Sequence, residues 1–347
     1  MAHRVVIVGG GAAGMQTALE LKSRGIEPMI VERDIELGGK ARAWHKLFPS
    51  FTPASDIMQP LAQRVKSERI RCFYGQEVVD IASDGVMLRS GERIPADAVV
   101  VATGFTLFDA HRKQEYGYGL YDNVLTSVDL ERMMNGGCVA LADGSKPRRI
   151  AILHCVGSRD EKVCQKHCSK VCCITGVKQA IELKQLIPDA DVFNFYMDIR
   201  MFGPGYEELY REAQERYNVH FVRGRISEAS ETINKRIQIK AEDTLTGRPL
   251  RMTVDMLVLL VGMSANYENE ELAKRAGLEL APNGYFRTVD SFLGAVRSQR
   301  EGIFFAGAAT APKSLADTLA EASLTASAVD DYLRRRFNTA STERTEL

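Results

Sequence analysis

A strand, a glycine-rich turn and a helix open the sequence, and this unit most constrains what the chain can fold into. The apolar residues 5–8 run directly into Gly9-Gly-Gly-Ala-Ala-Gly14, and good helix formers follow to about residue 22. A second apolar run, residues 28–31, ends at Glu32. The order and length are those of a βαβ unit. Glycines in such a turn let backbone amides approach a pyrophosphate at the positive end of the helix.

We therefore predict that the opening unit binds a nucleotide, the alternative being a turn that only packs tightly. Glu32, at the end of the second strand, can accept hydrogen bonds from ribose hydroxyls. Three further segments resemble those of flavoproteins and favour FAD over NAD: residues 36–41, 102–104 and 306–308. The candidate FAD contacts are Gly9, Gly11, Ala12, Ala13, Gly14, Glu32, Arg33, Gly39, Lys40, Ala41, Val78, Ala102, Thr103, Gly104, Gly307, Ala308, Asp317 and Thr318.

The closing segment departs from the flavoprotein pattern at one position. Many flavoproteins carry an aspartate after the glycine, whereas this chain carries Ala308, so the contact with the ribityl hydroxyls must come from the backbone or from elsewhere. A helix from about Leu315 could direct its first amides at the flavin. Asp317 and Thr318 would then lie near the ring, or would only cap the helix. Lys40, Trp44 and His45 are further candidates for the ring, with packing as the alternative for the aromatic pair.

A second strand and helix, at residues 149–153 and about 172–186, interrupt the first unit, which the strand at 302–306 and the helix from Leu315 complete. This order resembles that of two-domain flavoprotein reductases such as the thioredoxin reductases. We predict an α/β fold with two nested Rossmann-type domains. The predicted parts are an FAD domain (1–110 and 285–337), a connection (111–144), a second Rossmann-like domain carrying a cluster (145–284) and a flexible tail (338–347).

Five of the seven cysteines fall between Cys155 and Cys173. Cys168 and Cys172 are four residues apart, so they would share one helical face, and Cys155 follows a predicted strand. This density favours an iron–sulfur cluster. The alternatives are zinc with His154 or His167, a dithiol–disulfide centre, although the region has no CxxC motif, and buried inert thiols.

The stretch His154-Cys-Val-Gly-Ser-Arg, with Cys168-Ser-Lys-Val-Cys-Cys173, resembles the flavoprotein of heterodisulfide reductase, known as its A subunit. The resemblance extends to residues 117–119, 195–203 and 307–313, and covers nearly the whole chain. It implies that a [4Fe–4S] cluster is held by Cys155, Cys168, Cys172 and Cys173, with Cys164 as a spare. Pro53 and Asp56 stand where longer forms carry cysteines. The chain is therefore most similar to the short A subunit of the heterodisulfide-reductase-like complex of sulfur-oxidising bacteria.

Charge balance and hydropathy argue against nucleic-acid binding and against a membrane span. Lysine plus arginine equals aspartate plus glutamate at 45 each, so no strong field favours nucleic acid. No apolar run approaches the roughly 20 residues of a membrane span, and the N-terminus shows no signal peptide. We expect a cytoplasmic protein without a membrane span.

The resemblance implies an oxidoreductase that transfers electrons through FAD and [4Fe–4S], works with the other subunits of such a complex, serves sulfur-compound oxidation and forms a homodimer. One glycine, Gly157, stands where a nicotinamide site would need three, which disfavours NAD(P) in the second domain. The first alternative is a stand-alone NAD(P)H-dependent flavoprotein reductase of thiols or ferredoxin. The second is a scaffold or redox sensor whose cluster only stabilises an assembly.

Overall fold

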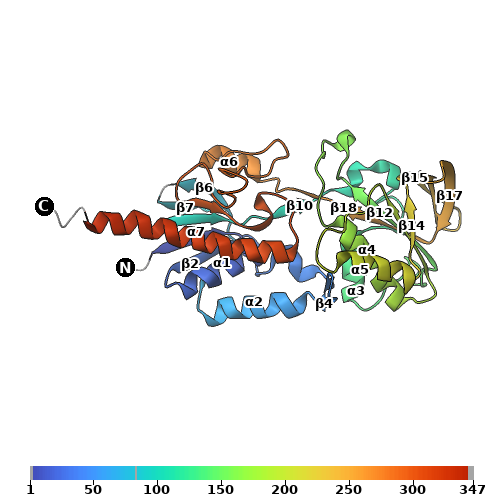
Figure 1. The fold of residues 1–347 in the computed structure, drawn as a ribbon, viewed down its shortest axis with the longest axis horizontal. Helices are drawn as coiled ribbons and strands as arrows, with labels where there is room; N and C mark the ends of the chain where they lie inside the picture. Colours follow the sequence, from blue (N-terminus) through green and yellow to red (C-terminus); the bar gives the residue numbers. More distant parts are fainter. Residues whose placement is uncertain (1–2, 83, 343–347) are drawn as a thin grey trace. The chain divides into compact units, whose positions relative to one another are not determined.

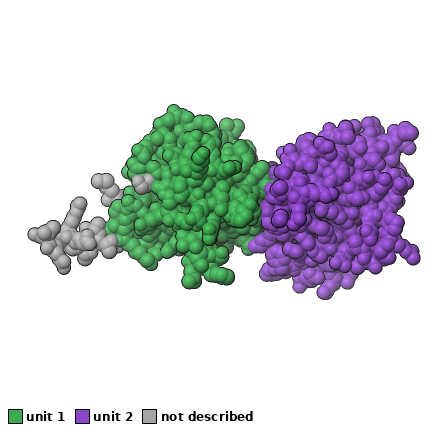
Figure 2. Space-filling view, turned by 90° about the horizontal axis from the view of Figure 1, so that it is seen from above, with its two compact units in different colours: residues 1–42, 55–106, 264–347 green, residues 43–54, 107–263 purple. Residues whose placement is uncertain are grey.

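A computed structural model describes residues 3–82 and 84–342. The chain forms two compact units (Figure 2). Unit 1 comprises residues 1–42, 55–106 and 264–347, and unit 2 comprises residues 43–54 and 107–263. The elements that span the boundaries are η1 (Gly39–Ala43), β10 (Phe105–Leu107) and β19 (Met263–Ala265).

Unit 1 is built on a five-stranded parallel sheet in the order β20-β9-β1-β2-β5. Its elements are β1 (Arg4–Val8), α1 (Ala12–Ser23), β2 (Glu27–Glu32), α2 (Ser55–Ser67), β5 (Arg71–Tyr74), β6 (Val78–Ala82), β7 (Gly85–Leu88), β8 (Arg93–Pro95), β9 (Ala98–Val101), α6 (Asn269–Ala276), β20 (Ile303–Phe305), η5 (Gly307–Ala309) and α7 (Leu315–Thr342). The central β1 pairs in parallel with β2 and β9. Its residues Val5 to Val8 are buried because layers cover both faces of the sheet.

The two faces of this sheet have different covers. Val6 and Val8 of β1 pack in one cluster with residues of the small antiparallel sheet β6-β7-β8 and of α6. Helices α1 and α7 pack against each other, and α7 also packs on β9 and β20 (Figure 1). The N-terminal strand–helix unit and the C-terminal helix therefore share one layer, as the nested order predicts.

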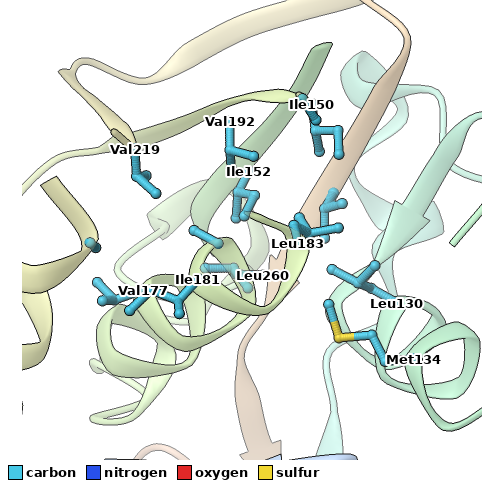
Figure 3. Packing of buried hydrophobic residues seen from close by; sticks show 14 of the residues in the cluster. Leu130, Met134, Ile150, Ile152, Val177, Ile181, Leu183, Val192, Val219 and Leu260 are labelled. Carbon is cyan, nitrogen blue, oxygen red and sulfur yellow. The ribbon is translucent and has the colours of Figure 1, made fainter. Parts of the chain in front are cut away.

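Unit 2 repeats this plan with the parallel sheet β11-β18-β12-β13-β14 and the antiparallel sheet β15-β16-β17. Its elements are β3 (Lys46–Leu47), β4 (Thr52–Pro53), η2 (Ala110–Arg112), η3 (Gln114–Tyr116), β11 (Val124–Thr126), α3 (Ser127–Asn135), β12 (Arg149–Val156), η4 (Glu161–Val163), α4 (Cys172–Leu186), β13 (Asp191–Tyr196), α5 (Tyr206–Glu215), β14 (His220–Arg223), β15 (Ile226–Glu231), β16 (Ile237–Asp243), β17 (Arg248–Val254) and β18 (Met256–Val261). Val177 and Ile181 of α4 face Ile152 of β12 (Figure 3). The opposite face, including Leu153, packs on the antiparallel sheet.

The structure draws the domain boundaries differently from the sequence. Within the predicted connection, β11 pairs with β18 at the edge of the unit 2 sheet and α3 packs on the same strands. Residues 264–284, predicted for the second domain, join unit 1 because α6 buries Leu272 and Ala276 in its core. Residues 43–54 join unit 2, where Phe48 and Phe51 pack against the helical core.

The predicted flexible tail is helical at its start, since α7 continues to Thr342. The rest of that prediction, residues 343–347, lies outside the described residues. Over the part of the chain that is described, no helix combines the length and the apolar character needed to span a membrane.

Candidate cofactor sites

Two glycines of the opening turn are demanded by the packing of unit 1. Gly9 has a φ of +108°, and a Cβ placed on it would lie 2.5 Å from the carbonyl oxygen of Ala102. A Cβ on Gly14 would lie 1.9 Å from the carbonyl oxygen of Gly9. The turn therefore presses against the end of β9, which brings the predicted Ala102–Gly104 segment to it.

Gly11 has no such explanation within the protein. Its φ is −72°, which any residue can adopt, and a Cβ there would meet no described atom within 4 Å. Gly11 is also the N-cap of α1, and no side chain among the described residues caps this helix. The first amides of α1, which include those of Ala12 and Ala13, therefore have no capping side chain among the described residues, and uncapped helix amides are ready partners for a phosphate.

Glu32 and Gly39 both lie at the turn. Glu32 Oε2 accepts a hydrogen bond from the Gly10 N–H at 2.6 Å, and Oε1 accepts one from the Asp34 N–H at 2.9 Å. Each carboxylate oxygen keeps a further acceptor position for a ribose hydroxyl. The Gly38 N–H donates to the Gly10 carbonyl at 2.9 Å, and a Cβ on Gly39 would lie 3.2 Å from Gly11 Cα.

The C-terminal segment reaches the same turn. A Cβ on Gly307 would lie 2.7 Å from Ala13 Cβ and 3.1 Å from Thr318 Cγ2. Thr103 Oγ1 is buried and finds no hydrogen-bond partner among the described residues. Gly104, with a φ of +70°, borders space that is open for 4 Å. The structure thus brings together predicted residues that are about 300 positions apart in the sequence.

Other predicted flavin contacts have protein partners of their own. The guanidinium of Arg33 pairs with Glu268 at 3.0 Å. The side chain of Val78 packs in the core of unit 1, and both Ala41 and Ala308 are buried.

Lys40 and the start of α7 also differ in detail from the prediction. Lys40 Nζ lies 5.1 Å from the centre of the Phe105 ring, and burial lowers the pKa of this lysine. Ser314, which the sequence analysis did not consider, caps α7: its Oγ accepts a hydrogen bond from the Asp317 N–H at 3.1 Å. Its position directly before an apolar helix was the available signal.

His45 belongs to a buried group of charges in unit 2 that the sequence did not reveal. Its Nδ1 lies 2.8 Å from Glu182 Oε1, and its backbone N–H donates to Glu131. Lys178 Nζ lies 2.5 Å from Glu131 and 3.0 Å from Glu182. Burial, helped by the nearby Glu131, raises the pKa of Glu182 against the attraction of Lys178. The ring of His45 thus contacts Glu182 of α4. His45 is one of the two aromatic residues, with Trp44, that were candidates for contact with the flavin ring.

Three of the four predicted cluster ligands meet in unit 2. A bulge interrupts the pairing of β12 with β18 between Leu153 and Val156, and Cys155 inside it has a φ of +60°. A bulge re-aims a side chain, and the thiol of Cys155 hydrogen-bonds to that of Cys172. Cys172 also hydrogen-bonds to Cys173. All three cysteines are buried, and we call them the thiol nest.

The surroundings of the thiol nest favour the thiolate form of Cys155 and Cys173 and the thiol form of Cys172. The hydrogen bond with Cys172 lowers the pKa of Cys173 to about 4, with burial opposing and the imidazole of His154 assisting. The same donor lowers the pKa of Cys155 to about 7, again against burial and with help from His154. The pKa of Cys172 is raised well above its ordinary value, because its interactions with Cys155 and Cys173 and its burial all favour the neutral thiol. Cys172 and Cys173 also begin α4, whose N-terminus attracts negative charge.

Cys168, the fourth predicted ligand, is not in this contact. Its Sγ accepts a hydrogen bond from the Lys170 N–H at 3.4 Å, and it shares with Cys155 the nearby charge of Arg159. Cys164, the predicted spare, is exposed. Among the described residues, no group of three or more Cys, His, Asp or Glu side chains has the arrangement of a metal site. The three thiols of the nest are suitable ligands for a metal that prefers sulfur, whereas Cys168, the fourth predicted ligand, lies outside the nest.

The connection between β12 and α4 takes the place of a second dinucleotide turn. It runs over residues 157–171, whereas β1 and α1 are joined by residues 9–11 alone. Arg159, Cys164 and Lys170 have left-handed φ angles of 54°, 60° and 63°, and such non-glycine strain concentrates at functional sites. The buried carboxylate of Asp160 stabilises the connection between β12 and α4, because it accepts hydrogen bonds from Lys113 at 2.8 Å and from Arg225 at 2.5 Å.

Comparison with known proteins supports the same picture. Residues 3–166 and 172–329 match the family of pyridine nucleotide-disulphide oxidoreductases. The skipped residues include Cys168. Thioredoxin reductases of T. acidophilum (TM-score 0.67, 19% identity, 95% of this chain and 98% of that one) and Lactococcus lactis (0.68, 16%, 96% and 99%) share the fold. The predicted α/β fold of a two-domain flavoprotein with Rossmann-type domains is confirmed.

The curated relatives confirm the resemblance read from the cysteine motif, since their names are those of A subunits of heterodisulfide reductases. The iron-sulfur A subunit of the CoB–CoM heterodisulfide reductase of Methanocaldococcus jannaschii is 33% identical over 93% of this chain and 63% of its own length. The A subunit of the H2/formate:CoB-CoM heterodisulfide,ferredoxin reductase of Methanococcus maripaludis is 44% identical over 68% of this chain and 37% of its own length. The chain thus spans less than two thirds of these relatives.

Proposed function

The chain belongs to the pyridine nucleotide-disulphide oxidoreductase family, and from that premise we propose that it is the electron-transfer component of a heterodisulfide-reductase-like complex and binds FAD and one [4Fe–4S] cluster. One observation carries the proposal: the first dinucleotide turn is complete, while a cysteine-rich connection with a thiol nest replaces the second. The residue types therefore suit a flavin nucleotide in unit 1 and an iron–sulfur centre in unit 2.

The residues of unit 1 support the flavin half. The uncapped amides of α1 would hold the pyrophosphate, and the open space at Gly11 would admit it. Glu32 would accept from the ribose hydroxyls while the Gly10 N–H keeps its carboxylate in position. The Gly307 segment would approach from the C-terminal side.

The residues of unit 2 support the cluster half. Cys155, Cys172 and Cys173 would supply thiolates, and their mutual hydrogen bonds and His154 already favour this form at Cys155 and Cys173. Cys168 would complete the set, and its sulfur already has an N–H donor. Relatives whose names call them iron-sulfur subunits support the same assignment. Bound FAD would supply two-electron chemistry, and a bound cluster would supply single-electron transfer.

The likeness to a short A subunit supports a role of the proposed complex in sulfur-compound oxidation in the cytoplasm, with the other subunits as electron partners and this chain as a homodimer. The relatives act, by their names, on the CoB–CoM heterodisulfide. Light scattering of the purified chain tests the dimer, since a monomeric mass would reject it.

Anaerobic purification tests the cofactors. We expect one FAD, about four irons and about four acid-labile sulfides per chain. Zinc as the only metal would reject the cluster, and protein that neither retains nor rebinds FAD would reject the flavin. Sustained dye reduction by NADPH or NADH with iron-free protein would select the stand-alone reductase instead.

A further inference from the structure

Glu321 of α7 is a partly buried carboxylate that the proposed function leaves without a role. Its side chain is 16% exposed, and its Oε2 lies 3.3 Å from Lys313 Nζ. The other oxygen, Oε1, is buried and has no hydrogen-bond partner within the described residues. A buried acceptor without a donor costs free energy. A donor from outside the chain would remove that cost.

Glu321 is linked to both backbone groups of Gly307, to the N–H directly and to the carbonyl through Lys313. The backbone N–H of Gly307 favours the ionised Glu321 carboxylate, since it acts to lower the pKa of that group. The Gly307 carbonyl accepts from Lys313 Nζ at 2.9 Å, and this ammonium also contacts Thr310 Oγ1 at 2.6 Å. Gly307 is the residue that meets Ala13 of the nucleotide turn. The carboxylate is therefore held by the segment that closes the candidate FAD site.

The electrostatics leave this carboxylate incompletely compensated. Burial raises the pKa of Glu321, Asp317 adds to the rise, and Lys313 and the Gly307 N–H oppose it. The rise prevails, so the donors inside the protein do not match the cost of burying the charge. A further hydrogen bond to Oε1 would stabilise the ionised form.

The chemistry of FAD narrows the class of donor. Phosphate oxygens and ring carbonyls are acceptors that a carboxylate repels, so the possible donors of FAD are its hydroxyls, the N3–H of the flavin ring and the amino group of adenine. The ribose hydroxyls are the expected partners of Glu32. Among the other donors, the ribityl hydroxyls are those that the closing segment at Gly307 is expected to meet, and Ala308 offers them no side-chain acceptor. We propose that Glu321 Oε1 accepts a hydrogen bond from a ribityl hydroxyl of FAD, with Lys313 as the residue that positions the carboxylate.

The inference rests on the proposed binding of FAD, and its test separates the two. Apoprotein of the full chain is titrated by flavin fluorescence with FAD and with an FAD analogue whose linker is an unsubstituted pentyl chain. We compare wild type with Glu321→Ala and the isosteric Glu321→Gln. Asp331→Asn on the same helix, where Asp331 pairs with Arg335 and Arg297, is the control.

We expect Glu321→Ala to weaken FAD binding about tenfold or more, the effect of one lost hydrogen bond to a charged group, and Glu321→Gln to lose less. Neither variant should change the Kd of the analogue, and Asp331→Asn should change neither Kd. An unchanged Kd for FAD in Glu321→Ala would overturn the inference. Equal weakening of FAD and the analogue would also overturn it, because Glu321 would then act only through the fold of the glycine segment. Wild-type protein that binds no FAD would instead reject the proposed function.

Discussion

Replacing Gly11 by alanine tests whether the opening turn is a nucleotide site or only a tight turn. The added methyl group meets no described atom within 4 Å, and the φ of −72° suits alanine. Removing a glycine from the unfolded chain stabilises a protein by about 0.4–1 kcal/mol. Alanine is a poorer N-cap than glycine, which costs roughly 0.5–1 kcal/mol. The two effects nearly cancel, so the apoprotein should unfold within about 2 °C of wild type.

Binding of FAD should respond differently, because the methyl group fills the space through which a pyrophosphate would approach. We expect a Kd at least about tenfold higher, or roughly 1.4 kcal/mol. Gly14→Ala is the matched contrast: its Cβ would lie 1.9 Å from the Gly9 carbonyl, so the fold itself should lose about 1–3 kcal/mol or more. Differential scanning fluorimetry of apoprotein and flavin titration measure both. The reasoning would be refuted if Gly11→Ala bound FAD with the wild-type Kd, or if the apoprotein of Gly11→Ala were as unstable as that of Gly14→Ala.

The remaining predictions concern unit 2. Asp160→Asn should destabilise unit 2 by about 3–5 kcal/mol. Hydrogen bonds from Lys113 and Arg225 outweigh burial and lower the pKa of Asp160, so the stabilisation by this carboxylate is present above about pH 4 and is lost as the pH falls through the lowered pKa. Acid unfolding monitored by circular dichroism should therefore lack this pH-dependent step in the variant. Lys178→Met removes the lysine that pairs with two buried carboxylates, Glu131 and Glu182, and should cost about 3–5 kcal/mol in urea unfolding, whereas a change below about 1 kcal/mol would contradict the ionic arrangement. Cys168→Ser should abolish the iron content of anaerobic protein and Cys164→Ser should leave it unchanged; equal iron in both variants would remove Cys168 from the ligand set.

The predicted strands and helices of both Rossmann-type sheets are where the sequence was most informative. The strand at residues 4–8 and the helix at about 172–186 coincide with β1 and α4, because an apolar run bounded by a glycine turn or a proline is a local signal. The short strands β6, β7 and β8 went unpredicted. Each has only three to five residues, so the periodicity that would reveal them is too brief.

The candidate binding residues also differ in how far the sequence reveals them. Glycine positions were predictable because a turn with left-handed angles or close backbone approach excludes side chains. The roles of Ser314 and Glu321 were not, since a serine and a glutamate in a helical sequence look alike whether they contact solvent or a buried segment. Their significance comes from the donors and acceptors that the fold places around them.

The amino-acid sequence by itself determined the order of the two nested units, the nucleotide turn and the clustering of cysteines, because these follow from spacing along a covalent chain. Only the tertiary structure decided that Cys155 meets Cys172 while Cys168 stands apart, that His45 joins Glu182, and that residues 43–54 and 264–284 lie in the units opposite to those expected. Such pairings depend on how buried side chains of distant segments pack and satisfy each other's charges, and no local pattern in the chain records that outcome.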